Sequence, residues 1–106
     1  MSSQDPAGPQ PEPSLPEDVE ATHTSAEFTA ASVPDALLAE HQTGPGQWAV
    51  LEVLDGQLTF VDVTNDAPRP VTVTGPGAVV IPPTRPHKLQ IEGEVRFLLR
   101  FYRARS

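Results

Sequence analysis

An Asp-Gly pair between two apolar, alternating segments constrains the fold of this chain more than any other feature. The segments Gln47–Leu54 and Gln57–Val63 flank Asp55-Gly56, and both loop positions tolerate the positive φ that a type I′ turn requires. The pattern predicts a hairpin with a two-residue loop, in which Val53 pairs with Leu58. One face of this hairpin then carries apolar residues from both segments, namely Ala49, Leu51, Val53, Leu58 and Phe60.

Short apolar segments separated by turn residues continue after this hairpin and favour an all-β domain. We predict strands over 71–74, 78–81 and 87–91. The clearest alternation, over Val95–Tyr102, predicts a strand with Val95, Phe97, Leu99 and Phe101 on one face. A single helical turn is expected over Pro34–His41, because Ala, Leu and Glu favour helix. Six or more short strands in about eighty residues predict a small barrel or jelly roll.

The first 24 residues differ from the rest in composition. They contain five prolines and five acidic residues, and their only large apolar residues are Met1, Leu15 and Val19. Such a segment buries too little apolar surface to offset the entropy of ordering. We therefore predict a disordered, acidic, Pro-rich N-terminal tail over 1–24 and a β-barrel domain over 25–106.

Charge is distributed unevenly along the chain. Twelve acids and no Lys or Arg up to Asp66 give −12, and seven bases with two acids after it give +5. The two parts are expected to attract each other within one fold or across a dimer, unless composition simply drifts along the chain. The net charge of −7 argues against nucleic acid or an anionic membrane as the main partner.

Other absences narrow the function classes further. Without cysteine there is no disulfide and no thiolate, so any metal would rest on His, carboxylate and amide groups. The apolar runs are too short to span a bilayer, and the N-terminus lacks the pattern of a secretory signal. We expect a cytoplasmic protein.

Five segments, taken in order, resemble the small single-domain cupins related to the TehB tellurite-resistance and YeaR proteins. The resemblance covers roughly 27–103 and implies a double-stranded β-helix, or jelly-roll, fold. It also implies an association with tellurite or nitrate-linked stress, without one established reaction. The segments are 34–38 (PDALL), 41–48 (HQTGPGQW), 51–58 (LEVLDGQL), 82–87 (PPTRPH) and 95–102 (VRFLLRFY).

The resemblance also implies where a metal would bind. Metal-binding cupins supply two histidines and a glutamate from a first motif and one histidine, after a proline, from a second. Here His87 fits the second motif, whereas the first retains only His41. A catalytic metal commonly has three protein ligands, so Gln47 or Glu52, as alternatives, or a neighbouring subunit would complete the site. Zn, Fe, Mn or Ni would suit it, and no organic cofactor is expected.

Each histidine also has a purely structural interpretation. His41 can end a helical turn, where the helix dipole favours it. His87 can hydrogen-bond a backbone group at the start of a strand. These interpretations leave the metal site as one of two alternatives.

A ligand site without a metal rests on different residues. Trp48 can form the wall of an apolar pocket at the barrel mouth. Arg85, Arg96 and Arg100 can form a cluster that binds an anion. The alternative for these arginines is a solvated face, or pairing with the acidic half of the chain.

Three functions follow from different classes. The first is a small cupin that binds a small ligand or oxyanion in a stress response, with little or no catalysis. The second is a metal-dependent oxygenase or isomerase that uses His41 and His87. The third is an interaction module whose acidic tail recruits a partner. Because the hairpin is apolar on both faces, we also predict a homodimer.

Overall fold

Antiparallel strands make up most of the fold. The computed structural model describes residues 15–64 and 68–105. Predicted strands after the Asp-Gly pair are confirmed, with boundaries moved by a few residues, and so is the helical turn. The elements are β1 (Val19–Thr24), β2 (Phe28–Thr29), α1 (Asp35–Leu38), β3 (Gln47–Asp62), β4 (Arg69–Thr74), β5 (Gly77–Ile81), β6 (His87–Gln90) and β7 (Val95–Ala104).

The predicted hairpin around Asp55-Gly56 is wrong, because both segments belong to the single long strand β3. Its first half, up to Val53, pairs with β5 and β7, whereas its second half, from Gln57 on, pairs with β4 and β6. Between the halves the register with β7 shifts, and Gly56 has a φ of 78°. The Asp-Gly pair is therefore a bulged bend within a strand and not a loop between two strands.

The bend explains why the predicted hairpin and the observed bent strand fit the same apolar pattern. Side chains alternate along a regular strand, so Val53 and Leu58, five positions apart, would lie on opposite faces. An extra residue at a bulge reverses this alternation, as a two-residue hairpin loop also does. Both residues are buried, with exposed fractions of 0% and 2%. The predicted apolar face is thus confirmed, although the predicted pairing of Val53 with Leu58 is not.

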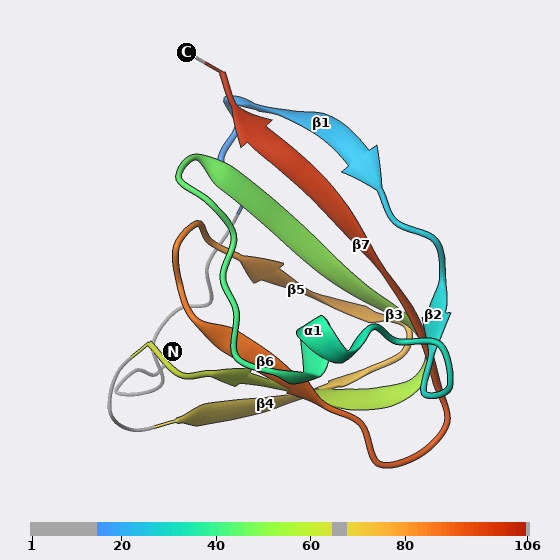
Figure 1. Cartoon of the computed structure of the whole chain (residues 1–106). Coiled ribbons are helices and arrows are strands. Elements are labelled where there is room, and N and C mark those ends of the chain that lie inside the picture. Colours follow the sequence, from blue (N-terminus) through green and yellow to red (C-terminus); the bar gives the residue numbers. More distant parts are fainter. Residues whose placement is uncertain (1–14, 65–67, 106) are drawn as a thin grey trace, which may run out of the picture.

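Figure 1 shows the two layers that the bend creates, with β1, β7, β5 and the first half of β3 above β4 and β6. The layers enclose one core, and α1 lies beside β6. All strand pairs are antiparallel, which confirms the all-β class. The core consists of Ala49, Leu51, Val53, Leu58, Phe60, Val73, Ile81, Leu89, Val95, Phe97 and Leu99.

The prediction of a disordered tail is wrong for its last residues. Val19–Thr24 form β1, which pairs antiparallel with β7. Val19 is half-buried and the other five residues of β1 are exposed, so the strand is held mainly by backbone hydrogen bonds. The part of the predicted tail over 1–14 lies outside the described residues.

The two oppositely charged parts of the chain meet within one fold. In the described part of the chain, every ion pair joins an arginine from the second part to an acid from the first. Exposed pairs of this kind contribute little each, about 0–1 kcal/mol. The pairs are Arg85–Asp62, Arg96–Glu27, Arg100–Glu52, Arg103–Glu20 and Arg105–Glu20. Across residues 15–64 and 68–105, no helix has the length and apolar character that crossing a membrane requires.

Candidate functional site

Two histidines 46 positions apart in the sequence meet where the segment after α1 crosses the start of β6. The backbone N–H of His41 donates to the carbonyl of His87, and the N–H of His87 donates to the carbonyl of His41, each at 2.9 Å. Thr84 N–H also donates to the carbonyl of Thr43 at 3.0 Å. These hydrogen bonds fix the segment that carries His41 against the strand that carries His87.

The two imidazole rings lie edge to face, with centroids 4.3 Å apart. The Nδ1 atom of His41 lies 3.2 Å from the carbonyl oxygen of Ala39, and the Nδ1 atom of His87 lies 2.8 Å from that of Arg85. His87 is only 3% exposed and stacks on Phe60, with ring centroids 5.2 Å apart. A carbonyl oxygen only accepts hydrogen bonds, so each Nδ1 carries the proton and each Nε2 presents a lone pair.

An ion pair lies beside this histidine pair. Asp62 is the register partner of His87 between β3 and β6. Its carboxylate accepts a hydrogen bond from Arg85 at 2.7 Å and another from the N–H of Thr64 at 2.8 Å. Arg85 also donates from Nε to the hydroxyl of Thr64 at 3.4 Å. The site therefore contains two imidazoles, each hydrogen-bonded through Nδ1 to a backbone carbonyl, next to an Arg–Asp ion pair.

Two titratable groups of the site, His87 and Asp62, have shifted pKa values. Burial lowers the pKa of His87, helped by the nearby His41, and this outweighs the hydrogen bond to the Arg85 carbonyl and the charge of Asp62. Burial raises the pKa of Asp62, but hydrogen bonds from Thr64 and the charge of Arg85 outweigh it, so the net shift is downward. His87 is therefore neutral and Asp62 ionised near neutral pH.

We expect the lowered pKa of His87 to make the fold less stable in mild acid. The unfolded chain, with His87 at its ordinary pKa of 6.5, binds the proton more readily than the folded chain. The stabilisation by neutral His87 is thus fully present above that pKa and is lost as the pH falls below it. Urea unfolding at several values from about pH 7.5 down to about pH 5 measures this loss of stability. We expect the loss to be absent in His87→Phe, which has no imidazole to protonate.

His23→Phe is the matched control, because His23 is exposed on β1, where it stacks on Phe101. This variant should keep the wild-type dependence on pH. The lowered pKa of Asp62 acts in a separate window, since its stabilisation is lost only as the pH falls below about 3.8. If the wild-type protein has the same free energy of unfolding at about pH 7.5 and at about pH 5, the prediction is contradicted.

The predicted metal ligands do not assemble into a three-ligand centre. Among the described residues, no group of three His, Cys, Asp or Glu side chains could hold a metal ion. Glu52 lies between the buried Leu51 and Val53, on the opposite face of β3, and pairs with Arg100. The side-chain oxygen of Gln47 accepts a hydrogen bond from Gly44 at 3.3 Å. Over 15–64 and 68–105, the side chains of one chain therefore do not form the usual three-ligand catalytic metal site.

The structure separates the other predicted ligand residues from the histidines. Arg96 and Arg100 alternate with the buried Phe97 and Leu99, so they lie on the outer face of β7. They pair with Glu27 and Glu52, as the alternative of pairing with the acidic half requires. Trp48 also lies on the outer face, opposite Tyr102. Of the predicted ligand-binding set, Arg85 contacts His87 through its backbone carbonyl, and its guanidinium pairs with Asp62, the register partner of His87.

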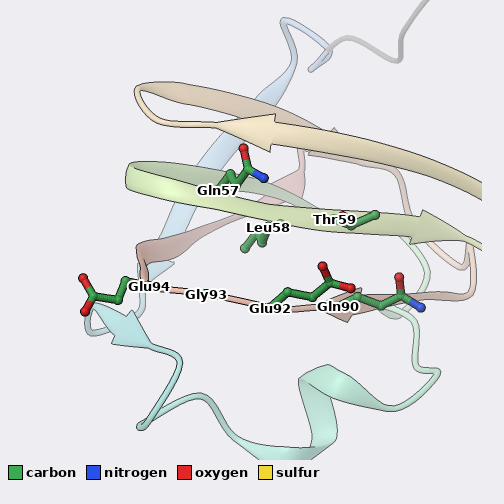
Figure 2. A pocket seen from close by; sticks show the side chains of 7 residues that line it. All are labelled: Gln57, Leu58, Thr59, Gln90, Glu92, Gly93 and Glu94. Carbon is green, nitrogen blue, oxygen red and sulfur yellow. The ribbon is translucent and has the colours of Figure 1, made fainter.

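A shallow cavity of about 210 Å³ lies at the other end of β6, between β3 and the turn before β7. Figure 2 shows the Glu92 side chain directed toward β3, whereas the Glu94 side chain points away. This cavity is separate from the histidine pair. It is lined by Gln57, Leu58, Thr59, Gln90, Glu92, Gly93 and Glu94.

Sequence reasoning missed Asp62 and Phe60 as parts of the site. The sequence alone indicated no role for Asp62 and placed Phe60 only on the apolar face of the predicted hairpin. The one available indication was the prediction of a barrel, in which the end of one strand can lie beside the start of another, as β3 and β6 do. Without the register between β3 and β6, nothing paired Asp62 with His87.

Comparisons with known proteins identify the family and the fold. A family model described as a TehB-like domain matches residues 23–99. A crystal structure of an Escherichia coli K12 protein aligns with a TM-score of 0.79 at 17% identity, covering 88% of this chain and 98% of that one. TehB from Haemophilus influenzae aligns with a TM-score of 0.70 at 22% identity, covering 83% of this chain and 32% of TehB.

These likenesses differ in what they establish. At these identities the two structures show the fold alone. This chain corresponds to about a third of the length of TehB. No curated protein sequence matches the chain.

Proposed function

Because the chain belongs to the TehB-like domain family, we propose that it is a small cupin of the jelly-roll type that binds an oxyanion in a stress response. The binding site lies at the start of β6, where His41 and His87 meet, and it includes Arg85. The protein acts by holding this ligand and not by transforming it. The proposal rests on the family and on the unmet hydrogen-bonding capacity of this site.

The buried imidazole of His87 carries the proposal. Its Nδ1 is satisfied by the Arg85 carbonyl, but no hydrogen bond to its Nε2 is present among the described residues. Buried polar atoms without a partner are rare, because each one costs about 1–3 kcal/mol. A bound ligand that donates to Nε2 would remove this cost. His41, next to it, offers a second acceptor of the same kind.

Arg85 supplies hydrogen-bond donors for the oxygens of an oxyanion. Two of its donors are occupied, by Asp62 and Thr64. A guanidinium has five N–H donors in all, so others remain for a ligand. The association of TehB with resistance to tellurite, itself an oxyanion, supports this class of ligand.

We expect Arg85→Gln to weaken the binding of selenite, a soluble analogue of tellurite, by about ten- to hundred-fold. A hydrogen bond to a charged group contributes about 1.5–3 kcal/mol, which corresponds to this range. Asp62→Asn should act in the opposite direction, because it removes the negative charge that neutralises Arg85. Isothermal titration calorimetry at neutral pH measures the selenite affinity of the wild-type protein and of both variants.

Arg100→Gln is the matched control for this experiment. Arg100 also belongs to an Arg–carboxylate pair, but on the outer face of β7. Its replacement should leave selenite affinity unchanged, and thermal melts should show that every variant is folded. Equal affinities for wild type and Arg85→Gln would remove Arg85 from the site, and absence of selenite binding to wild type would refute the proposed function.

The alternative is a metal-dependent oxygenase or isomerase. One observation favours it, since histidines that bind a metal usually donate their other ring N–H to a backbone carbonyl, as His41 and His87 do. The third ligand would have to come from Gln47 or a neighbouring subunit. Elemental analysis of protein purified without an affinity tag separates the two functions. A stoichiometric metal that is lost in His87→Ala would support the alternative, and absence of a metal would exclude it.

The homodimer, the cytoplasmic location and the recruitment of a partner by the N-terminal segment stay predictions. None of them bears on the oxyanion site.

A further inference from the structure

We infer that the site selects oxyanions that still carry an O–H proton, such as hydrogen selenite or hydrogen tellurite, and discriminates against oxyanions that carry none. This inference rests on the proposed function and concerns the same site. It follows from which atoms of the two histidines are free and from the net charge around them.

The hydrogen bonds to backbone carbonyls determine the tautomer of both rings. The Nδ1 atoms of His41 and His87 face the carbonyl oxygens of Ala39 and Arg85. A neutral imidazole has one N–H, and here that N–H is on Nδ1, so Nε2 can only accept a hydrogen bond. An oxyanion without protons also offers only acceptors. Its oxygens would meet the lone pairs of Nε2 without a hydrogen between them.

The surroundings of His87 also favour its neutral state. His87 is buried, and its ring centroid lies 4.3 Å from that of His41. A positive charge on either ring would repel a charge on the other and would be costly to bury. Burial and the neighbouring His41 both lower the pKa of His87. The site therefore does not become a pair of cationic donors near neutral pH.

The charges that face His87 limit the charge that the ligand can bring. Asp62 on β3 is the register partner of His87, and its carboxylate pairs with the guanidinium of Arg85, whose backbone carbonyl accepts from His87. These two groups form an ion pair with a separation of 2.7 Å, so together they are neutral. A dianion would bring two negative charges next to this neutral ion pair, whereas a monoanion brings only one. A monoanion that uses its O–H toward Nε2 and its other oxygens toward Arg85 meets both requirements.

Three simple oxyanions distinguish the effect of the O–H proton on affinity from the effect of the ligand's net charge. Near neutral pH selenite is chiefly a monoanion with one O–H, nitrate is a monoanion without one, and sulfate is a dianion without one. We expect selenite to bind at least tenfold more tightly than either nitrate or sulfate in calorimetry at constant ionic strength. The chain has no cysteine, so no thiol consumes selenite during the titration.

Each result has a distinct meaning. Equal binding of selenite and nitrate would overturn the inference and leave the oxyanion site intact, because charge alone would then govern affinity. Tighter binding of sulfate than of selenite would also overturn it. Failure of all three probes to bind would refute the proposed function itself.

Variants and the tautomer provide a second test. His41→Phe keeps a ring and removes one acceptor, so selenite affinity should fall by about fivefold or more while the weak nitrate affinity stays the same. His23→Phe, on exposed β1, should change neither affinity. Because a variant can fail for lack of folding, long-range ¹H–¹⁵N spectra of the wild-type imidazoles give an independent result. Protonated Nδ1 on both rings supports the inference, and protonated Nε2 on His87 overturns it.

Discussion

Truncation of Phe97 to alanine is expected to leave little folded protein at 25 °C. Phe97 is fully buried near the start of β7, opposite Val53 and next to the ring of Phe28, whose centroid lies 5.7 Å away. Removing such a ring costs about 3–5 kcal/mol. A domain of this size is stabilised by only about 3–5 kcal/mol in total. The loss therefore equals the whole stability of the fold.

Circular dichroism during urea unfolding measures this effect. Leu98→Ala is the matched control, because Leu98 is the next residue along β7 but lies on the outer face, half-buried. Its truncation should cost about 1 kcal/mol, and the variant should remain folded. Phe97 is not at the centre of the core if Phe97→Ala lowers the free energy of unfolding by less than about 2 kcal/mol. The same conclusion follows if both variants lower it equally.

Gly56→Ala is expected to destabilise the domain by more than about 2 kcal/mol. Gly56 has a φ of 78°, a conformation that costs other residues about 1–2 kcal/mol. In addition, a Cβ at this position would overlap the backbone carbonyl oxygen of Glu94, which is part of the main chain and cannot rotate away. Either β3 must straighten at its bend or the start of β7 must move.

Two other glycines separate these causes. Gly46 has a φ of 72° but open space around its Cβ position, so Gly46→Ala should show the conformational cost alone, about 1–2 kcal/mol. Gly93 has neither constraint, and Gly93→Ala should be close to neutral. Urea denaturation of the three variants ranks them. Equal losses at Gly56 and Gly46 would show that the bend is not tightly packed against β7.

Alternation of apolar residues predicted most of the strands because burial on one face imposes it directly. It could not distinguish a hairpin from a bent strand at Asp55-Gly56, since both reverse the side-chain alternation and both accept glycine at positive φ. The distinction depends on β5 and β7, which pair with the first half of β3 and lie far from it in the sequence. Such long-range pairings leave no local trace.

The edge strand Val19–Thr24 was missed for a related reason. Its residues are mostly exposed, so it shows no apolar pattern, and its order comes from backbone pairing with β7. In the site, the proximity of His41 and His87 could be anticipated from the expected barrel. The neutralisation of Arg85 by Asp62 could not, because it depends on the register between β3 and β6.

The position of β7 has a consequence for synthesis on the ribosome. This last strand lies between β1 and β3 in the upper layer, and it contributes Phe97 and Leu99 to the core. Neither β1 nor the first half of β3 has its full set of partners until residues 95–104 have left the exit tunnel. The nascent domain therefore cannot fold stepwise from its beginning. Until β7 is in place, the apolar face of the first half of β3 lacks the core residues that cover it.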